Sequence, residues 1–181
     1  MKWYLTVSIP RRHPAAMLSC VFMAGAAIIR LCYYLPRQMS PLIFWAHLVL
    51  PVAAAVVFLG GFALGGRWAK GGVLAAVAMG VAFFLIKAAG FTPVHRTLCT
   101  LLYLAVLVLV SATLLGLLPT KKLLYPLFAL PLSYHLLVED TQKYFFARPP
   151  VPVTEWMPEM SVLCIMAALL SLSFALKTEK R

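Results

Sequence analysis

Ionisable side chains interrupt the long apolar runs of this sequence at few positions, and these are the residues that could do chemistry. They are Arg30, His47, Lys87, His135 and Glu139. His135 and Glu139 are four residues apart, so they share one face if their segment is helical. A carboxylate among cations can pair with one of them and leave another to bind an anionic group. Because such groups are costly in apolar surroundings, we treat them as candidate functional residues.

The elements that must position these residues are membrane-spanning helices. The 181 residues are 63% hydrophobic and 12% charged, whereas a soluble domain has roughly half and a quarter. Apolar runs of about 20 residues match a hydrocarbon core of about 30 Å. The runs are continuous, whereas the strands of a membrane barrel alternate apolar and polar residues. This pattern indicates helices.

We therefore predict an all-α integral membrane protein that forms a single polytopic domain over residues 1–181. Its fold is expected to be a bundle of six transmembrane helices arranged as three antiparallel hairpins. The expected helices cover residues 15–35, 42–64, 73–89, 97–118, 123–138 and 159–176. Helices two and three are expected to approach closely along a stripe of small residues. The stripe comprises Gly61, Gly65, Gly72, Ala76 and Gly80.

Basic residues are distributed unequally between the two sides of this bundle. The side with both termini holds ten Lys and Arg residues and one acid, and the other side holds six basic residues and four acids. Cytoplasmic loops carry the excess of Lys and Arg. The predicted localisation is the cell membrane, multi-pass, with both termini cytoplasmic. The net charge of +11 is then explained by cationic helix ends that lie against anionic lipid. No Arg/Lys block is present that would indicate binding to nucleic acid.

The segment Tyr134–Glu159 is the expected outer loop, and it holds four of the five acidic residues. We expect the candidate residues to converge in one outward-facing polar cavity, covered by the part of the loop from Tyr144 to Trp156. The predicted ligand-binding residues are Arg30, His47, Lys87, His135, Glu139 and Trp156. Glu139 would pair with one cation, and a small anionic or zwitterionic solute would neutralise the other. The alternative is that Arg30 and Lys87 reach lipid headgroups and make only structural contacts.

Signatures of catalysis and of bound cofactors are missing from the sequence. It has no HExxH, no GxSxG, no P-loop and no Gly-rich dinucleotide motif. The cysteines Cys20, Cys32, Cys99 and Cys164 form no CxxC pair and no metal-ligand spacing. We expect no enzyme, no cofactor and no metal.

Two functions fit these features. The first is a transport or solute-capture subunit, whose layout is similar to that of substrate-binding subunits of bacterial energy-coupled vitamin transporters, although no motif is shared. The second is a non-transporting membrane scaffold, sensor or assembly/regulatory subunit with a membrane protein partner. A capture subunit should be stabilised by a solute, whereas a scaffold should be stabilised by a protein.

Overall fold

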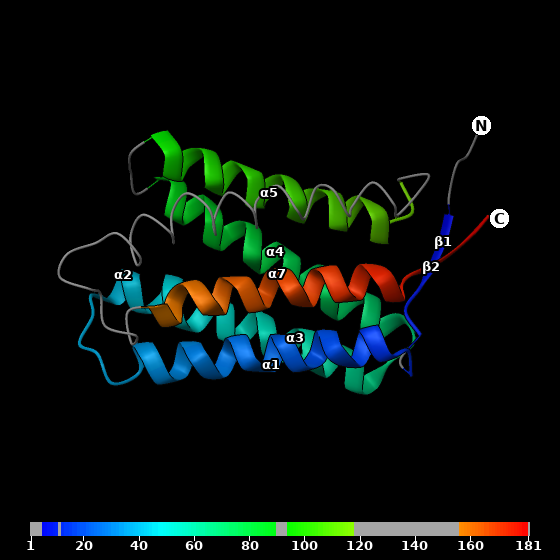
Figure 1. Cartoon of the computed structure of the whole chain (residues 1–181), viewed down its shortest axis with the longest axis horizontal. Helices are drawn as coiled ribbons and strands as arrows, with labels where there is room; N and C mark the ends of the chain where they lie inside the picture. Colours follow the sequence, from blue (N-terminus) through cyan, green and yellow to red (C-terminus); the bar gives the residue numbers. More distant parts are fainter. Residues whose placement is uncertain (1–4, 11, 90–93, 118–155, 181) are drawn as a thin grey trace.

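Long apolar helices form the body of the protein (Figure 1). The structure, a computed structural model, describes residues 5–10, 12–89, 94–117 and 156–180. In this part of the chain four helices are long and apolar enough to cross a membrane, as expected of a helical membrane protein. The elements in chain order are β1 (Leu5–Ser8), α1 (Pro14–Tyr34), α2 (Pro41–Phe44), the π-helix η1 (Trp45–Val49), α3 (Leu50–Leu64), α4 (Arg67–Ala89), α5 (Val94–Leu114), α7 (Met157–Ala175) and β2 (Lys177–Lys180).

The turn between α3 and α4 is shorter than the sequence suggested. The helix expected to start at residue 73 already starts at Arg67. Gly65 and Gly66 alone make the turn, with φ angles of 72° and 54°, a left-handed backbone that favours glycine. Gly65 therefore belongs to this turn rather than to the predicted helical stripe.

The end of α5 also differs from its prediction. The helix ends at Leu114 rather than at residue 118, because Gly116 adopts a φ of 76°. The Gly116 amide bonds to the Thr113 carbonyl at 3.0 Å, and the Leu117 amide bonds to the Ala112 carbonyl at 2.9 Å. These two bonds form a Schellman motif, which satisfies carbonyls of the last turn.

The second predicted helix is divided into α2, η1 and α3, and Pro51 explains the division. Proline has no N–H, and its ring crowds the carbonyl four residues earlier, here that of His47. The helix widens in response, so that the Leu50 amide bonds to the Trp45 carbonyl five residues back.

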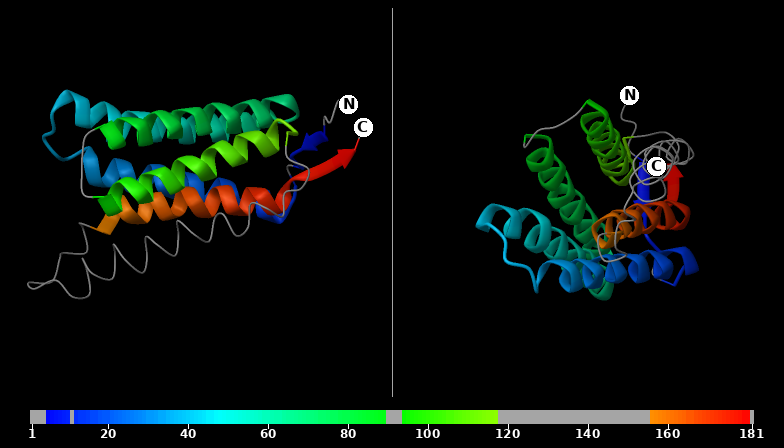
Figure 2. Two further views of the ribbon diagram at one scale, coloured as in Figure 1. Left: turned by 90° about the horizontal axis from the view of Figure 1, so that it is seen from above. Right: turned by 60° about the vertical axis from the view of Figure 1, so that its left-hand side comes forward.

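Helix packing joins the first helix to the last. α1 packs most extensively against α7 and less against α3, whereas α3 packs mainly on α4, and α4 also contacts α5. Figures 1 and 2 both show α1 and α7 side by side. The main neighbour of α1 is thus α7 rather than the hairpin partner expected from the sequence. The fifth predicted helix, residues 123–138, lies outside the described residues.

Glycines bring α3 and α4 into close contact. A Cβ added at Gly61 would lie 2.7 Å from the Trp68 carbonyl oxygen and 2.8 Å from the Gly72 Cα. The predicted approach of these two helices is therefore present at Gly61 and Gly72. Gly80 differs from its prediction, because an added Cβ would lie 3.3 Å from Leu107 of α5.

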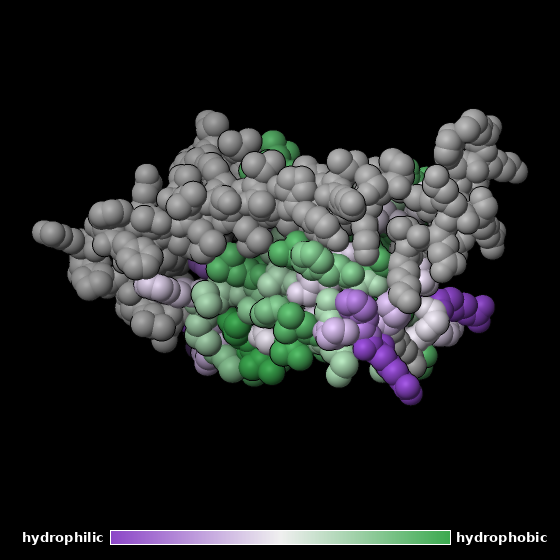
Figure 3. Space-filling view, turned by 45° about the vertical axis from the view of Figure 1, so that its right-hand side comes forward, coloured by the Kyte–Doolittle hydropathy of each residue, from purple (hydrophilic) through white to green (hydrophobic). Residues whose placement is uncertain are grey.

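The outer surface of the bundle is apolar as well as its interior. Met17, Val21 and Val56 are more than 60% exposed, whereas a soluble bundle carries polar residues on its outer face. Figure 3 shows this apolar face, with hydrophilic residues gathered toward the end that carries the termini. Trp45 and Trp68 are exposed at opposite ends of the α3–α4 pair, as in the aromatic belts of membrane proteins.

A small antiparallel sheet, which the sequence analysis did not predict, joins the two ends of the chain. β1 pairs with β2 from Leu5 opposite Lys180 to Ser8 opposite Lys177. Both strands lie at one end of the bundle, where α5 also ends, whereas α7 begins at the other end (Figures 1 and 2).

Candidate functional site

Among the residues whose side chains the structure describes, Arg30 is the one charged residue buried in the interior. It lies on α1, and only 2% of its surface is exposed. Residues buried on α1 recur every three or four positions (Ala16, Ser19, Met23, Ala26, Arg30 and Tyr34), so Arg30 belongs to the face that packs against the bundle. Inserting an arginine at the centre of a membrane helix costs about 2.5–3.5 kcal/mol. The contacts of Arg30 with its surroundings must offset much of that free-energy cost.

Two hydrogen bonds hold the Arg30 guanidinium between helices. Its Nε–H donates to the Ser161 hydroxyl oxygen on α7 at 2.5 Å. Its Nη1 donates to the His47 carbonyl oxygen in η1 at 2.9 Å. Arg30 therefore ties α1 to both α7 and η1.

The acceptor at His47 exists because of the proline that widens the helix. In a regular α-helix the amide of residue 51 would donate to this carbonyl, but Pro51 has no N–H. The guanidinium of Arg30 takes that position instead. Because Pro51 of α3 has no N–H, the His47 carbonyl can accept a hydrogen bond from Arg30 of α1.

Aromatic rings and a carboxylate complete the surroundings of the charge. The Arg30 guanidinium carbon lies 5.1 Å from the centre of the Phe83 ring and 5.6 Å from that of Tyr34. Ring faces attract cations at this range. The carboxylate of Glu159, in the first turn of α7, also interacts favourably with the Arg30 charge. The His47 ring lies 5.4 Å from that of Phe83.

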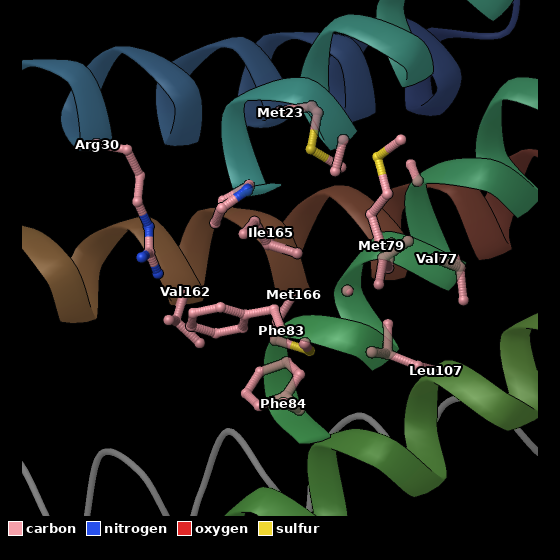
Figure 4. A pocket seen from close by; sticks show the side chains of 15 residues that line it. Met23, Arg30, Val77, Met79, Phe83, Phe84, Leu107, Val162, Ile165 and Met166 are labelled. Carbon is pink, nitrogen blue, oxygen red and sulfur yellow. The ribbon is translucent and has the colours of Figure 1, made fainter. Parts of the chain in front are cut away.

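Arg30 also lies at the edge of a central cavity of about 40 Å³ (Figure 4). Residues of α1, α3, α4, α5 and α7 form its walls. Among the described residues, all that line it except Arg30 are apolar, and they include Met23, Met79, Phe83, Val162 and Met166. In Figure 4 the Arg30 side chain extends from α1 toward Val162 and Phe83. The described wall of the cavity is therefore apolar, and the guanidinium head of Arg30 is bonded to Ser161 and His47 beside it.

Of the predicted ligand-binding residues, the structure brings Arg30 and His47 together. Trp156 immediately precedes α7, at the same end of that helix as Ser161. Lys87 lies in the last turn of α4, and its side chain is outside the described part. His135 and Glu139 also lie outside the described residues.

Three groups around Arg30 were not predicted from the sequence: the contacts Ser161 and Phe83 and the carboxylate of Glu159, which acts through its charge. For Glu159 a signal was available, because it is one of five acidic residues and stands in the first turn of an apolar helix. For Ser161 the signal was weak, since serine is common in membrane helices, where it packs or bonds to its own backbone. Phe83 carried none, because phenylalanine is common in every apolar run.

No cluster of three or more His, Cys, Asp or Glu residues suited to a metal ion occurs among the described residues. Comparisons of the chain with protein-family models, curated proteins and solved structures gave no match. The geometry around Arg30 is therefore the basis for any assignment of function.

Proposed function

We propose that the protein is a multi-pass membrane subunit that captures or transports a small anionic solute, with Arg30 as its anchor. The single observation that carries the proposal is a buried guanidinium at the edge of a central cavity. An ionisable residue inside a membrane span is a functional candidate by default.

The hydrogen bonds of Arg30 leave capacity for a ligand. A guanidinium has five N–H donors, and within the described residues two of them have an acceptor. A bound carboxylate or phosphate oxygen can accept two parallel N–H bonds from such a group. An anion that reaches the guanidinium would therefore add hydrogen bonds and a second negative charge beside that of Glu159.

We also propose six membrane crossings with both termini cytoplasmic. The proposal is supported by the β1–β2 pairing, which joins segments near both ends of the described chain, because two ends on one side of a membrane imply an even number of crossings. α5 ends on that side and α7 begins on the other, which supports one further crossing between them. The basic residues Arg12, Arg67 and Lys70 lie near the end with the termini, which is the cytoplasmic side by the positive-inside rule. Arg30 and the cavity edge are then closer to the outer surface.

A thermal-shift screen tests the capture function. Purified protein in detergent is heated with carboxylates, phosphates and sulfonates, and with their neutral amide or alcohol analogues. At least one anion is expected to raise the unfolding temperature while its neutral analogue does not, and Arg30→Gln should abolish that shift. Stabilisation by neutral solutes alone would contradict the proposal.

A second candidate function is a non-transporting scaffold or regulatory subunit. It is favoured by the hydrogen bonds of Arg30 to α7 and η1, which brace the bundle without a ligand. This candidate predicts that no solute changes the unfolding temperature and that a membrane protein copurifies in stable proportion.

A further inference from the structure

We propose that the start of α4 binds the headgroup of an anionic phospholipid, and that an acyl chain of this lipid lies along the outer face of α3 and α4. This site is separate from Arg30, so the inference goes beyond the proposed capture function and does not rest on it. Three observations support it: two cations in the first turn of α4, an exposed tryptophan between them, and open space beside two glycines.

The two cations are Arg67 and Lys70. They are three residues apart in the first turn of α4, so they lie close together on that helix. Arg67 is exposed and Lys70 is half-buried. The first turn of α4 contains no acidic residue, and within the described part of the chain neither cation has an ion-pair partner. Because like charges repel, an anion bound between them would be favourable.

The position of these residues matches the headgroup level of a bilayer. They begin the apolar span Arg67–Ile86, whose 20 residues are about as long as a hydrocarbon core is thick. Trp68 is 56% exposed, and the Arg67 guanidinium carbon lies 5.4 Å from the centre of its ring. Exposed tryptophans occur where headgroups meet acyl chains. A phosphate on Arg67 and Lys70 would therefore belong to a lipid whose acyl chain starts beside Trp68.

The outer face of the α3–α4 pair follows from its glycine contact. The two helices run in opposite directions and touch at Gly61 and Gly72. Successive residues of a helix are turned by about 100°, so the residues that follow the contact lie on one side of the pair and those that precede it lie on the other. Phe62 and Val73 follow the contact and are buried. They identify the inner side, and the preceding residues therefore face outward.

The preceding residues are Gly60 and Gly71, and they leave open space on the outer side. Both are exposed, and a Cβ built at either would meet no atom of the described residues within 4 Å. Arg67 and Trp68 lie four and three residues before Gly71, so they occupy the same face of α4 one turn nearer its start. An acyl chain that extends from a phosphate on Arg67 would run over these glycines.

The charge of the site selects an anionic headgroup over a zwitterionic one. Arginine binds phosphate oxygens through charge-assisted hydrogen bonds, and every phospholipid offers such oxygens. Phosphatidylcholine also carries a quaternary ammonium, whose charge would add to those of Arg67 and Lys70. Phosphatidylglycerol has neutral hydroxyls in its place, so its phosphate keeps a net negative charge beside the two cations.

Lipid retention tests the headgroup site. The protein is purified in detergent micelles with equal amounts of phosphatidylglycerol and phosphatidylcholine, and native mass spectrometry counts the lipids that each molecule retains. We expect one phosphatidylglycerol to be retained preferentially. Arg67→Gln and Lys70→Gln should each weaken its retention by roughly fivefold. Arg37→Gln is the matched control, because Arg37 is an exposed arginine just beyond the other end of α1, and it should leave retention unchanged.

A second pair of variants tests the path of the acyl chain. Gly71→Leu fills the open space on the outer face and should lower the retained fraction of phosphatidylglycerol. Gly25→Leu is its control, because Gly25 lies on α1 and also has no atom of the described residues within 4 Å of a built Cβ. Equal retention by these two variants would show that the chain does not follow the α3–α4 face.

The remaining outcomes decide between a lipid site and its alternatives. Equal retention of the two lipids, or an equal loss in Arg37→Gln, would show a diffuse effect of surface charge and overturn the site. Displacement of the retained lipid by millimolar glycerol 3-phosphate would show that the two cations bind free phosphate groups, and the lipid would be wrong.

Discussion

At the scale of single residues, Arg30 shows how this protein keeps a charge inside an apolar bundle. Its stem leaves α1, and its head reaches a hydroxyl on α7, a backbone carbonyl in η1 and the ring of Phe83 on α4, as well as the ring of Tyr34 on α1 itself. No single contact offsets the cost of burying the charge. Removing one partner is therefore expected to leave a buried donor unsatisfied rather than simply to delete one bond.

Ser161→Ala is the direct test of this account. The substitution removes the acceptor of the Arg30 Nε–H without leaving a large cavity. We expect a loss of about 1–3 kcal/mol in the free energy of unfolding, because the buried cationic donor loses its partner. Unfolding of the protein in mixed micelles, followed by circular dichroism on titration with a denaturing detergent, measures the change.

Ser173→Ala is the matched control for that measurement. Ser173 is also buried on α7, but its hydroxyl donates to the Leu170 carbonyl of its own helix at 2.6 Å. Such back-bonding contributes little to stability, so the change should stay below about 1 kcal/mol. Equal costs at the two serines would show that the bond to Arg30 is not a significant stabilising contact.

At the scale of elements, the α3–α4 pair depends on the absence of two side chains. Gly61 and Gly72 face one another closely enough that a methyl group on either would overlap backbone atoms. Lipid provides no hydrophobic driving force between helices, so close packing of backbones must hold the pair together.

Neighbouring glycines provide a paired test of this packing. Gly61→Ala and Gly72→Ala are expected to destabilise the protein by about 1–3 kcal/mol through overpacking. Gly60→Ala and Gly71→Ala place a Cβ where no atom lies within 4 Å, and they should be neutral or stabilising by up to about 1 kcal/mol through helix propensity. Thermal unfolding of the four variants measures the difference. If both pairs of substitutions change the unfolding temperature equally, close packing at Gly61 and Gly72 does not stabilise the α3–α4 contact.

The π-helix at Trp45–Val49 couples Pro51 to Arg30. Pro51→Ala would restore an amide that competes for the His47 carbonyl, which Arg30 now uses. In a double-mutant cycle, Arg30→Gln should therefore cost less stability in the Pro51→Ala background. We expect a coupling of about 0.5–1.5 kcal/mol, measured by the same unfolding titration. If the losses in unfolding free energy are strictly additive, Pro51 does not influence the hydrogen bond between Arg30 and the His47 carbonyl.

At the scale of the whole molecule, the β1–β2 sheet closes the chain at one end of the bundle. This pairing, together with the directions of α5 and α7, supports the proposal of six crossings (Figure 1). The α3–α4 turn lies at this same end of the bundle (Figure 1).

Reporter fusions test the proposed topology. Fusions at the C-terminus, after Gly66 and after Thr120 should report a cytoplasmic location because basic residues collect on that side. A fusion at Pro152 should report an extracytoplasmic location. A C-terminus found outside the cytoplasm would overturn the orientation, and a cytoplasmic Pro152 would overturn the number of crossings.

The sequence by itself determined that the protein is a helical membrane protein, and it located α1 and α7 to within two residues. It also predicted that Arg30 and His47 lie together, as their hydrogen bond shows, because ionisable groups are rare and costly within apolar runs. It identified Gly61 and Gly72 as packing residues, because small residues are needed where helices approach closely. These features depend on composition and on local spacing, which can be read along the chain.

Only the tertiary structure decided which residues surround Arg30 and which helix lies beside α1. Ser161 is 131 positions away from Arg30 in the sequence, and the apolar runs differ too little for any pattern to assign their neighbours. The pairing of β1 with β2 likewise joins short segments from opposite ends of the chain. In a membrane every helix face is apolar, so amphipathic patterning, which assigns helix faces in soluble proteins, carries little information here. The contacts are chosen by the fit of side chains in three dimensions.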